Sequence, residues 1–228
     1  MPLSDLQYYV DIVICIDKTG GMHFINDRIK ESLDSIYSGV EYAVMKKNCT
    51  IGQLRIKIIA FGDFGVDEKP IMVSDFYRYS DEKEYIERFL DDIKIGGGGD
   101  CPEDGLEAFA LALKSDWTTE GDRRRHVVMI FSNSPVNELG KNSDTPQYPD
   151  GMPADTEQLF GWWEETDCTL NSTFQPKAGR LIACIPEFDS WKRLESLSRS
   201  MTYYVPDYEL LAGDEFFDKF DYVFSAII

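Results

Sequence analysis

The sequence predicts a single α/β domain in which helices cover both faces of a doubly wound, mainly parallel sheet of about six strands. Apolar runs typical of buried strands alternate along the chain with segments that carry apolar residues at helical spacing. A chain of 228 residues can bury one large hydrophobic core without support from disulfides or metals. Because no internal repeat or linker divides it, we expect one domain over residues 1–228 with three α/β/α layers.

Six segments have the composition of strands. Residues 10–16 form a nearly continuous apolar run, as expected for a strand that is buried on both faces. In residues 54–61, Arg55 and Lys57 alternate with apolar side chains, which indicates one exposed face at the start of the strand. Residues 71–76 form a weaker strand, which we expect at an edge of the sheet. Further strands are predicted over 127–131, 179–185 and 201–205.

The helices are predicted from the spacing of their apolar residues. Residues 25–44 carry apolar side chains three and four positions apart, and residues 82–93 show one apolar stripe. The glycine run over 96–99 precedes a predicted helix over 103–117. Its start matches a capping box, with Asp100 as N-cap and Glu103 reaching back to it. Further helices are predicted over 155–165, 191–199 and 215–228, and residues 132–154 are predicted to form a long surface loop.

Three loops are expected to bring oxygen atoms to one edge of this sheet. Asp17 and Thr19 follow the first strand, Asp100 follows the glycine run, and Asn133 follows the strand over 127–131. Ligands of doubly wound sheets bind at the carboxyl ends of the strands, so these side chains should meet there. Carboxylate, hydroxyl and amide oxygens suit a hard cation, and the two histidines form no cluster for a softer metal. The sequence therefore predicts a Mg²⁺ site.

These motifs, in this order, resemble the von Willebrand factor type A domains over essentially the whole chain. The loop from Asp17 to Gly21 is similar to the D-x-[ST]-x-S motif of that family. Residues 97–104 resemble the GGGDxPE signature of its hemicentin and alpha-kinase-associated branch, and residues 144–151 resemble a loop of the same branch. The resemblance implies a metal-ion-dependent adhesion site with Mg²⁺, Mn²⁺ or Ca²⁺. A partner protein would add an Asp or Glu to the metal.

The sequence departs from the family pattern at two positions. Gly21 stands where the family has the last Ser of its motif, and Asn133 stands where an Asp is expected. Fewer carboxylates weaken a Mg²⁺ site, so a metal-free scaffold that binds proteins is an alternative. Structural roles also stay open: Asp17 and Thr19 can begin a helix, Asp100 can cap one, and Asn133 can form a turn.

A phosphohydrolase is the alternative from another class of function. Residues 14–20 resemble the DKTG core of the haloacid dehalogenases, in which the Asp, here Asp17, is a nucleophile beside Mg²⁺. That motif continues with Thr-Leu, where this chain has Gly21-Met22, and the phosphatases of the family have a second Asp where this chain has Thr19. No other catalytic motif stands in the sequence. We therefore expect a binding protein and no enzyme.

Composition limits the partners. The chain has 41 acidic and 23 basic residues, a net charge of −18, which disfavours nucleic acid and anionic membranes. No apolar run approaches the ~20 residues of a membrane span, and the first residues lack the features of a signal peptide. The five cysteines are scattered and form no CxxC motif, which is typical of a reducing compartment. We expect a cytoplasmic protein with a protein partner.

Overall fold

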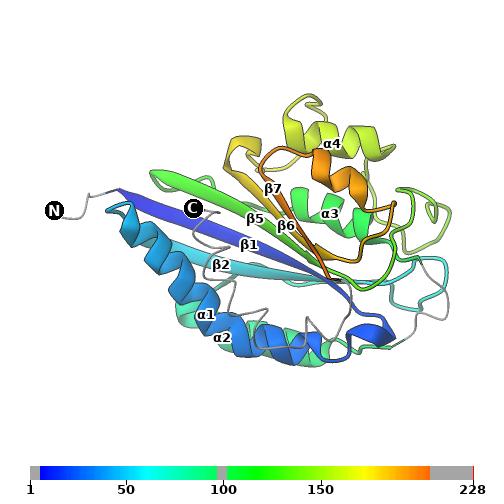
Figure 1. Ribbon diagram of the computed structural model, residues 1–228, viewed down its shortest axis with the longest axis horizontal. Helices are drawn as coiled ribbons and strands as arrows, with labels where there is room; N and C mark the ends of the chain where they lie inside the picture. Colours follow the sequence, from blue (N-terminus) through cyan, green and yellow to red (C-terminus); the bar gives the residue numbers. More distant parts are fainter. Residues whose placement is uncertain (1–5, 97–101, 206–227) are drawn as a thin grey trace.

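A sheet of seven strands lies at the centre of the described part of the chain, which comprises residues 6–96, 102–205 and 228 of the computed structural model (Figure 1). The strands are β1 (Gln7–Asp17), β2 (Thr50–Phe61), β3 (Ile71–Val73), β4 (Tyr77–Arg78), β5 (Arg123–Phe131), β6 (Gly179–Ile185) and β7 (Ser200–Tyr204). Their order is β3-β2-β1-β5-β6-β7, and β4 also pairs with β2. Only β3 and β4 pair antiparallel, so the predicted mainly parallel sheet is confirmed.

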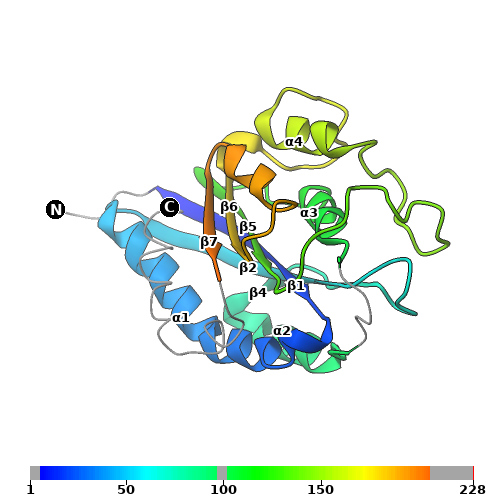
Figure 2. The ribbon, with the colours of Figure 1, turned by 45° about the vertical axis from the view of Figure 1, so that its right-hand side comes forward.

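Four α-helices cover the two faces of the sheet over the described residues (Figures 1 and 2). They are α1 (Ile25–Lys46), α2 (Tyr79–Asp92), α3 (Gly105–Leu113) and α4 (Thr156–Glu164). The first two share one hydrophobic cluster with Ile12, Ile14 and Ile16 of β1. The other two share a second cluster with Val13 and Cys15. Because successive side chains of a strand point to opposite faces, β1 contributes to both layers of the core, which confirms the prediction for its apolar run.

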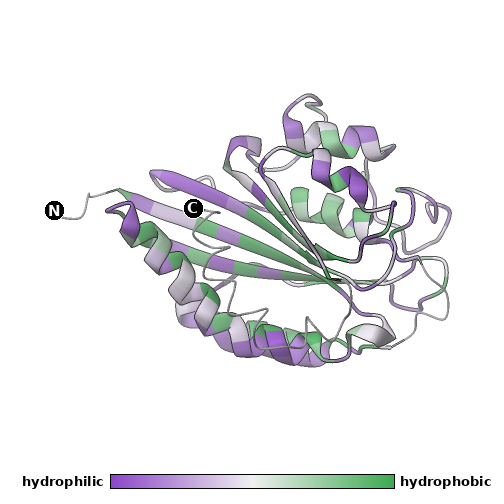
Figure 3. Cartoon of the chain, in the orientation of Figure 1, coloured by the Kyte–Doolittle hydropathy of each residue, from purple (hydrophilic) through white to green (hydrophobic). Residues whose placement is uncertain are grey.

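The hydropathy of the strands changes along their length (Figure 3). β5 begins with the basic residues Arg123–Arg125 and ends in a fully apolar run, and its exposure falls in the same direction. The predicted strand over 127–131 is therefore only its buried half. The carboxyl ends of the central strands lie deep in the core, where a loop that follows them can bury polar side chains.

The helix that we predicted over 103–117 is shorter in the structure, and the capping box predicted at its start is wrong. α3 begins at Gly105 with Asp104 as its N-cap. The main chain of Glu103 pairs with the segment at Pro135 and Asn137, through bonds of 3.0 and 2.8 Å. These long-range bonds hold residue 103 outside the helix. Asp100 itself lies outside the described residues.

Two other predicted elements differ in the structure. The predicted strand over 71–76 is shorter in the structure, where it comprises only β3, and β4 follows just beyond the predicted range. Residues 191–199 contain a short 3₁₀ helix, Lys192–Ser196, which ends because the backbone of Leu197 is extended, with a ψ of 134°. Arg199, with a positive φ of 58°, then precedes β7. The helix predicted over 215–228 lies outside the described residues, except for Ile228. Among the described helices, none has the length and apolar composition that a bilayer crossing requires.

The order of the strands reverses between β1 and β5. From β1 the chain passes through α1 to β2 on one side, whereas β5 leads to β6 on the other side. Ligands of open α/β sheets bind at the carboxyl ends of the strands at this point. Here the two carboxyl ends carry Asp17 and Ser132, and the fold therefore places the predicted first and third loops side by side.

Candidate metal centre

Asp17 is the last residue of β1, and its carboxylate is completely buried. One oxygen accepts hydrogen bonds from the main-chain N–H and the hydroxyl of Thr19, at 2.9 and 2.6 Å. The other accepts one from the hydroxyl of Ser132, at 2.7 Å. Burial raises the pKa of Asp17, while these donors and the main-chain N–H of Asn133 act in the opposite direction. The site therefore concentrates hydrogen-bond donors and hydroxyl oxygens around one acid.

Thr19 occupies the N-cap position of a short 3₁₀ helix, Gly20–Met22, but its side chain makes no capping bond. The hydroxyl points to Asp17 instead. A hydroxyl that donates its proton to a carboxylate keeps lone pairs for another partner. Thr19 therefore has an arrangement that a cation ligand needs, and the capping role that the sequence left open is not observed.

Asn133 lies in the loop after β5, half-buried, with its amide group over Gly21. A Cβ atom added to Gly21 would stand 1.9 Å from Nδ2 of Asn133. The two positions at which the chain departs from the family pattern thus contact each other. The structure brings Asp17, Thr19 and Asn133 together as predicted, while Asp100, the fourth predicted ligand, is outside the described residues.

Glu103, for which the sequence predicted a helix-capping role, lies close enough to Asp17 for its carboxyl group to be affected by the charge of that acid. Glu103 is 1% exposed, and neither carboxylate oxygen has a hydrogen-bond partner among the described residues. Burial, followed by the negative charge of Asp17, raises the pKa of Glu103 to about 8. A buried acid without a partner requires a proton or a cation. The signal in the sequence was the last residue of the GGGDxPE match, which is Glu103.

These residues fit a hard cation by their chemistry, since the donors are carboxylate, hydroxyl and amide oxygens. The unpaired carboxylate of Glu103 is the structural observation that supports this fit. In residues 6–96 and 102–205, however, no three His, Cys, Asp or Glu side chains form a group that could hold a metal. The arrangement therefore requires Asp100, a hydroxyl such as that of Ser132, or a ligand from outside the chain.

The long loop between β5 and α4 is attached to the rest of the molecule by a polar cluster of three buried residues and one half-buried residue, which we call the amide–carboxylate cluster. Its members are Asp63, Asp104, Asn137 and Asn142. Asn137 donates to Asp104 at 2.8 Å and to Asp63 at 3.2 Å. Asn142 donates to the same two acids, at 2.9 and 3.1 Å. The predicted loop is thus confirmed, and it is fixed beside the site rather than free in solvent.

A second attachment of this loop is the carboxylate of Glu107 in α3. It accepts hydrogen bonds from the N–H of Gly140 at 2.8 Å and from the hydroxyl of Tyr148 at 3.2 Å. Burial raises the pKa of Glu107 to about 7. The ring of Tyr148 also packs edge-on against Phe64, at 5.3 Å between centroids. The loop therefore forms a fixed wall next to the candidate metal centre.

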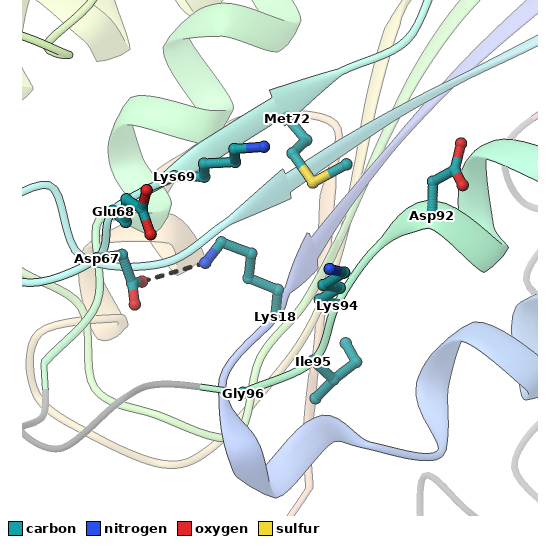
Figure 4. A pocket seen from close by; sticks show the side chains of 9 residues that line it. All are labelled: Lys18, Asp67, Glu68, Lys69, Met72, Asp92, Lys94, Ile95 and Gly96. Carbon is teal, nitrogen blue, oxygen red and sulfur yellow. Dashed lines mark hydrogen bonds and ion pairs between the residues drawn. The ribbon is translucent and has the colours of Figure 1, made fainter.

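A pocket of about 570 Å³ is lined by Lys18 of the first loop and by residues from 67–72 and 92–96 (Figure 4). Lys18 forms one wall, and its ammonium group pairs with Asp67 at 3.2 Å. The N–H of Gly96 donates to the carbonyl oxygen of Lys18 at 3.0 Å, which joins the pocket to the segment that precedes Asp100. The remaining lining residues are Glu68, Lys69, Met72, Asp92, Lys94 and Ile95. The pocket therefore offers space for side chains directly beside the site.

Comparison with known sequences gives one distant relative. No family model matches the chain. The alpha-protein kinase vwkA of Dictyostelium discoideum is 26% identical over 144 residues, which are 63% of this chain. The same residues are only 21% of the kinase. The chain therefore spans a small part of that relative, and the activity of the kinase does not extend to it on this ground.

Comparison with solved structures concerns the fold. The pilus adhesin SpaC of Lactobacillus rhamnosus GG aligns over 97% of this chain and 32% of its own, with a TM-score of 0.53 and 9% identity. Proximal thread matrix protein 1 of the mussel byssus, solved with a zinc-occupied MIDAS motif, aligns over 91% of this chain and 46% of its own, with a TM-score of 0.52 and 12% identity. The chain has a von Willebrand factor A-like fold. At these identities the likeness shows the fold alone.

Proposed function

We propose that this chain is a protein-interaction module of the von Willebrand factor A type. It binds a divalent cation, Mg²⁺ in the first place, at the carboxyl edge of its sheet, and a partner protein completes the site with an Asp or Glu. The observation that carries the proposal is the buried, unpaired carboxylate of Glu103 near Asp17, at the point where the strand order reverses. The zinc-occupied MIDAS motif of the mussel matrix protein supports it by analogy of fold.

The residues proposed to hold the ion, directly or through water, are Asp17, Thr19, Asp100 and Asn133, and we add Glu103 and Ser132 to this proposal. A bound divalent cation would supply positive charge for the buried acids and a coordination position for a partner's carboxylate. Mn²⁺ and Ca²⁺ use the same kinds of ligand and remain alternatives to Mg²⁺. The fixed wall of residues 132–154 and the pocket beside Lys18 would contact the partner around its acid.

The kind of partner and the setting are part of the proposal. The match to an alpha-protein kinase and the GGGDxPE-like segment support a place in the alpha-kinase-associated branch, where the chain would act beside an enzyme without being one. The four cysteines described in the structure form no disulfide, which is compatible with a cytoplasmic location. Neither an acidic protein surface nor this site suits nucleic acid.

The direct test is calorimetric titration of EDTA-treated protein with Mg²⁺ and then Mn²⁺. We expect saturable binding that Glu103→Gln weakens by about tenfold or more and that Asp17→Asn abolishes, because both remove negative charge from the site. Glu138→Gln is the matched control, since Glu138 is exposed and lies in the loop after β5. An absence of binding at millimolar metal, with and without a carboxylate ligand, would overturn the metal proposal in favour of the metal-free scaffold.

A further inference from the structure

The contact between Gly21 and Asn133 relates the two positions at which the chain departs from the family motif. The amide of Asn133 occupies the space of a side chain at position 21, because Nδ2 is 1.9 Å from the position of a Cβ there. The next nearest atom, Cγ of Asn133, is 3.1 Å away. A Ser at position 21, as in the family motif, would displace the amide. Gly21 therefore leaves the space that the amide of Asn133 occupies, and the two residues depend on each other in this structure.

The orientation of the amide is set from its other side. The hydroxyl of Ser134 donates to Oδ1 of Asn133 at 3.3 Å, so the carbonyl end of the amide is the end that accepts. This directs Nδ2 toward Gly21 and the first loop. Among the described residues, Nδ2 donates no hydrogen bond, and the side chain is only half-buried. Within the described part of the chain, this amide donor therefore has no acceptor, and it lies in the loop whose main chain contacts Asp17.

An amide and a carboxylate at position 133 interact differently with an anion. An Asp there would add a negative charge, which strengthens cation binding and repels a second carboxylate. An Asn removes that charge and supplies a donor for an oxygen of an approaching acid. We propose that Nδ2 of Asn133 binds the partner's carboxylate, so that Gly21 and Asn133 together exchange metal affinity for affinity toward an acidic side chain. This inference rests on the proposed metal site.

In this proposal Nδ2 of Asn133 recognises the ligand, and Asn133 acts on the ion only through that ligand or a water. Asp17 and Glu103 would provide charge for the cation, and Nδ2 would bind the carboxylate that arrives from the partner. The ligand class is a protein side-chain carboxylate, for which N-acetyl-aspartate amide is a chemical equivalent. Acetate has the same carboxylate group and is expected to bind more weakly. The uncharged N-acetyl-asparagine amide has the same shape and tests whether charge is recognised.

The experiment measures Mn²⁺ affinity by electron paramagnetic resonance, with and without N-acetyl-aspartate amide, at constant ionic strength. In the unmodified chain we expect the aspartate compound, and not the asparagine compound, to raise Mn²⁺ affinity by about threefold or more. Asn133→Asp should bind Mn²⁺ about tenfold tighter alone and lose the effect of the aspartate compound. Gly21→Ser should weaken that effect in the same way, because it displaces the amide.

The control is Asn171→Asp, which adds the same charge at an exposed position and should leave both measurements unchanged. If Asn133→Asp keeps the full effect of the aspartate compound, the role of Nδ2 is wrong while the metal site stands. If neither the unmodified chain nor Asn133→Asp binds Mn²⁺ under any condition, the proposed function itself fails, and this inference fails with it. The two failures are thus distinguishable.

Discussion

The hydroxyl of Ser132 donates a hydrogen bond of 2.7 Å to Oδ2 of Asp17 and joins the carboxyl ends of β5 and β1. The same oxygen of Ser132 accepts the N–H of Ser134 at 3.1 Å, so one hydroxyl fixes both the acid and the turn that carries Asn133. Asp17 and Ser132 are 115 positions apart along the chain. The bond is therefore a tertiary link in the middle of the candidate site, and it makes Ser132 a structural support of Asp17 whether or not a cation is bound.

Ser132→Ala should destabilise the metal-free protein by about 2 kcal/mol, because it removes a donor from a buried carboxylate. The pKa of Asp17 should rise further, since one of the hydrogen bonds that oppose its upward shift is lost. Urea unfolding followed by tryptophan fluorescence measures the change. Ser35→Ala, at an exposed position of α1, is the control and should change the free energy of unfolding by less than about 0.5 kcal/mol. Equal effects of the two variants would contradict the supporting role of Ser132.

Gly62→Ala should disrupt the ion pair between Lys18 and Asp67. A Cβ atom at this position would stand 2.0 Å from Oδ2 of Asp67 and 3.1 Å from Nζ of Lys18. Both side chains are largely buried, so separating them costs about 1–3 kcal/mol. Gly96→Ala is a matched control, because nothing lies within 4 Å of its Cβ position and it lines the same pocket. Thermal unfolding of the two variants side by side is the measurement, and a similar loss in both would contradict the packing argument.

How much of this site was predictable depends on the range of the interactions involved. Asp17, Thr19 and Asn133 were predictable as neighbours because each follows a strand, and parallel strands end at one edge. Glu103 was assigned to a capping box because local spacing favoured it, whereas its main chain pairs with Pro135 and Asn137. No pattern of neighbouring residues in the sequence predicts this long-range main-chain pairing. The same holds for Gly21 beside Asn133, which only the folded chain brings into contact.

The stability of the metal-free protein should fall as the pH rises from about 5 to 8. Burial raises the pKa of Glu103 to about 8 and that of Glu107 to about 7 in the folded state. An unfolded Glu releases its proton near pH 4.3, so between these values the folded state holds more protons than the unfolded chain. Stability then decreases with pH, by at most about 1.4 kcal/mol per pH unit for each group.

Urea unfolding of EDTA-treated protein at a series of pH values tests this dependence. Glu103→Gln should reduce the slope between pH 5 and 8, because a neutral amide no longer has to lose a proton. Mg²⁺ should reduce the slope in the unmodified chain as well if it binds the ionised Glu103. Glu138→Gln, with its exposed side chain, should leave the slope unchanged. A stability that rises over this pH range would show that Glu103 and Glu107 are ionised without penalty in the folded protein.

Tyr148→Phe should loosen the wall formed by residues 132–154 without unfolding the core. The variant loses the bond of 3.2 Å to Glu107, while the ring can keep its contact with Phe64. The expected cost is about 1 kcal/mol, and Glu107 keeps only the N–H of Gly140 as a loop donor. Hydrogen exchange should therefore become faster in residues 138–150 and stay unchanged in β1 and β5. Tyr42→Phe is the control, because Tyr42 is 56% exposed on α1. If exchange in residues 138–150 is the same in both variants, the amide–carboxylate cluster alone holds the loop, and the bond to Glu107 contributes nothing to the wall.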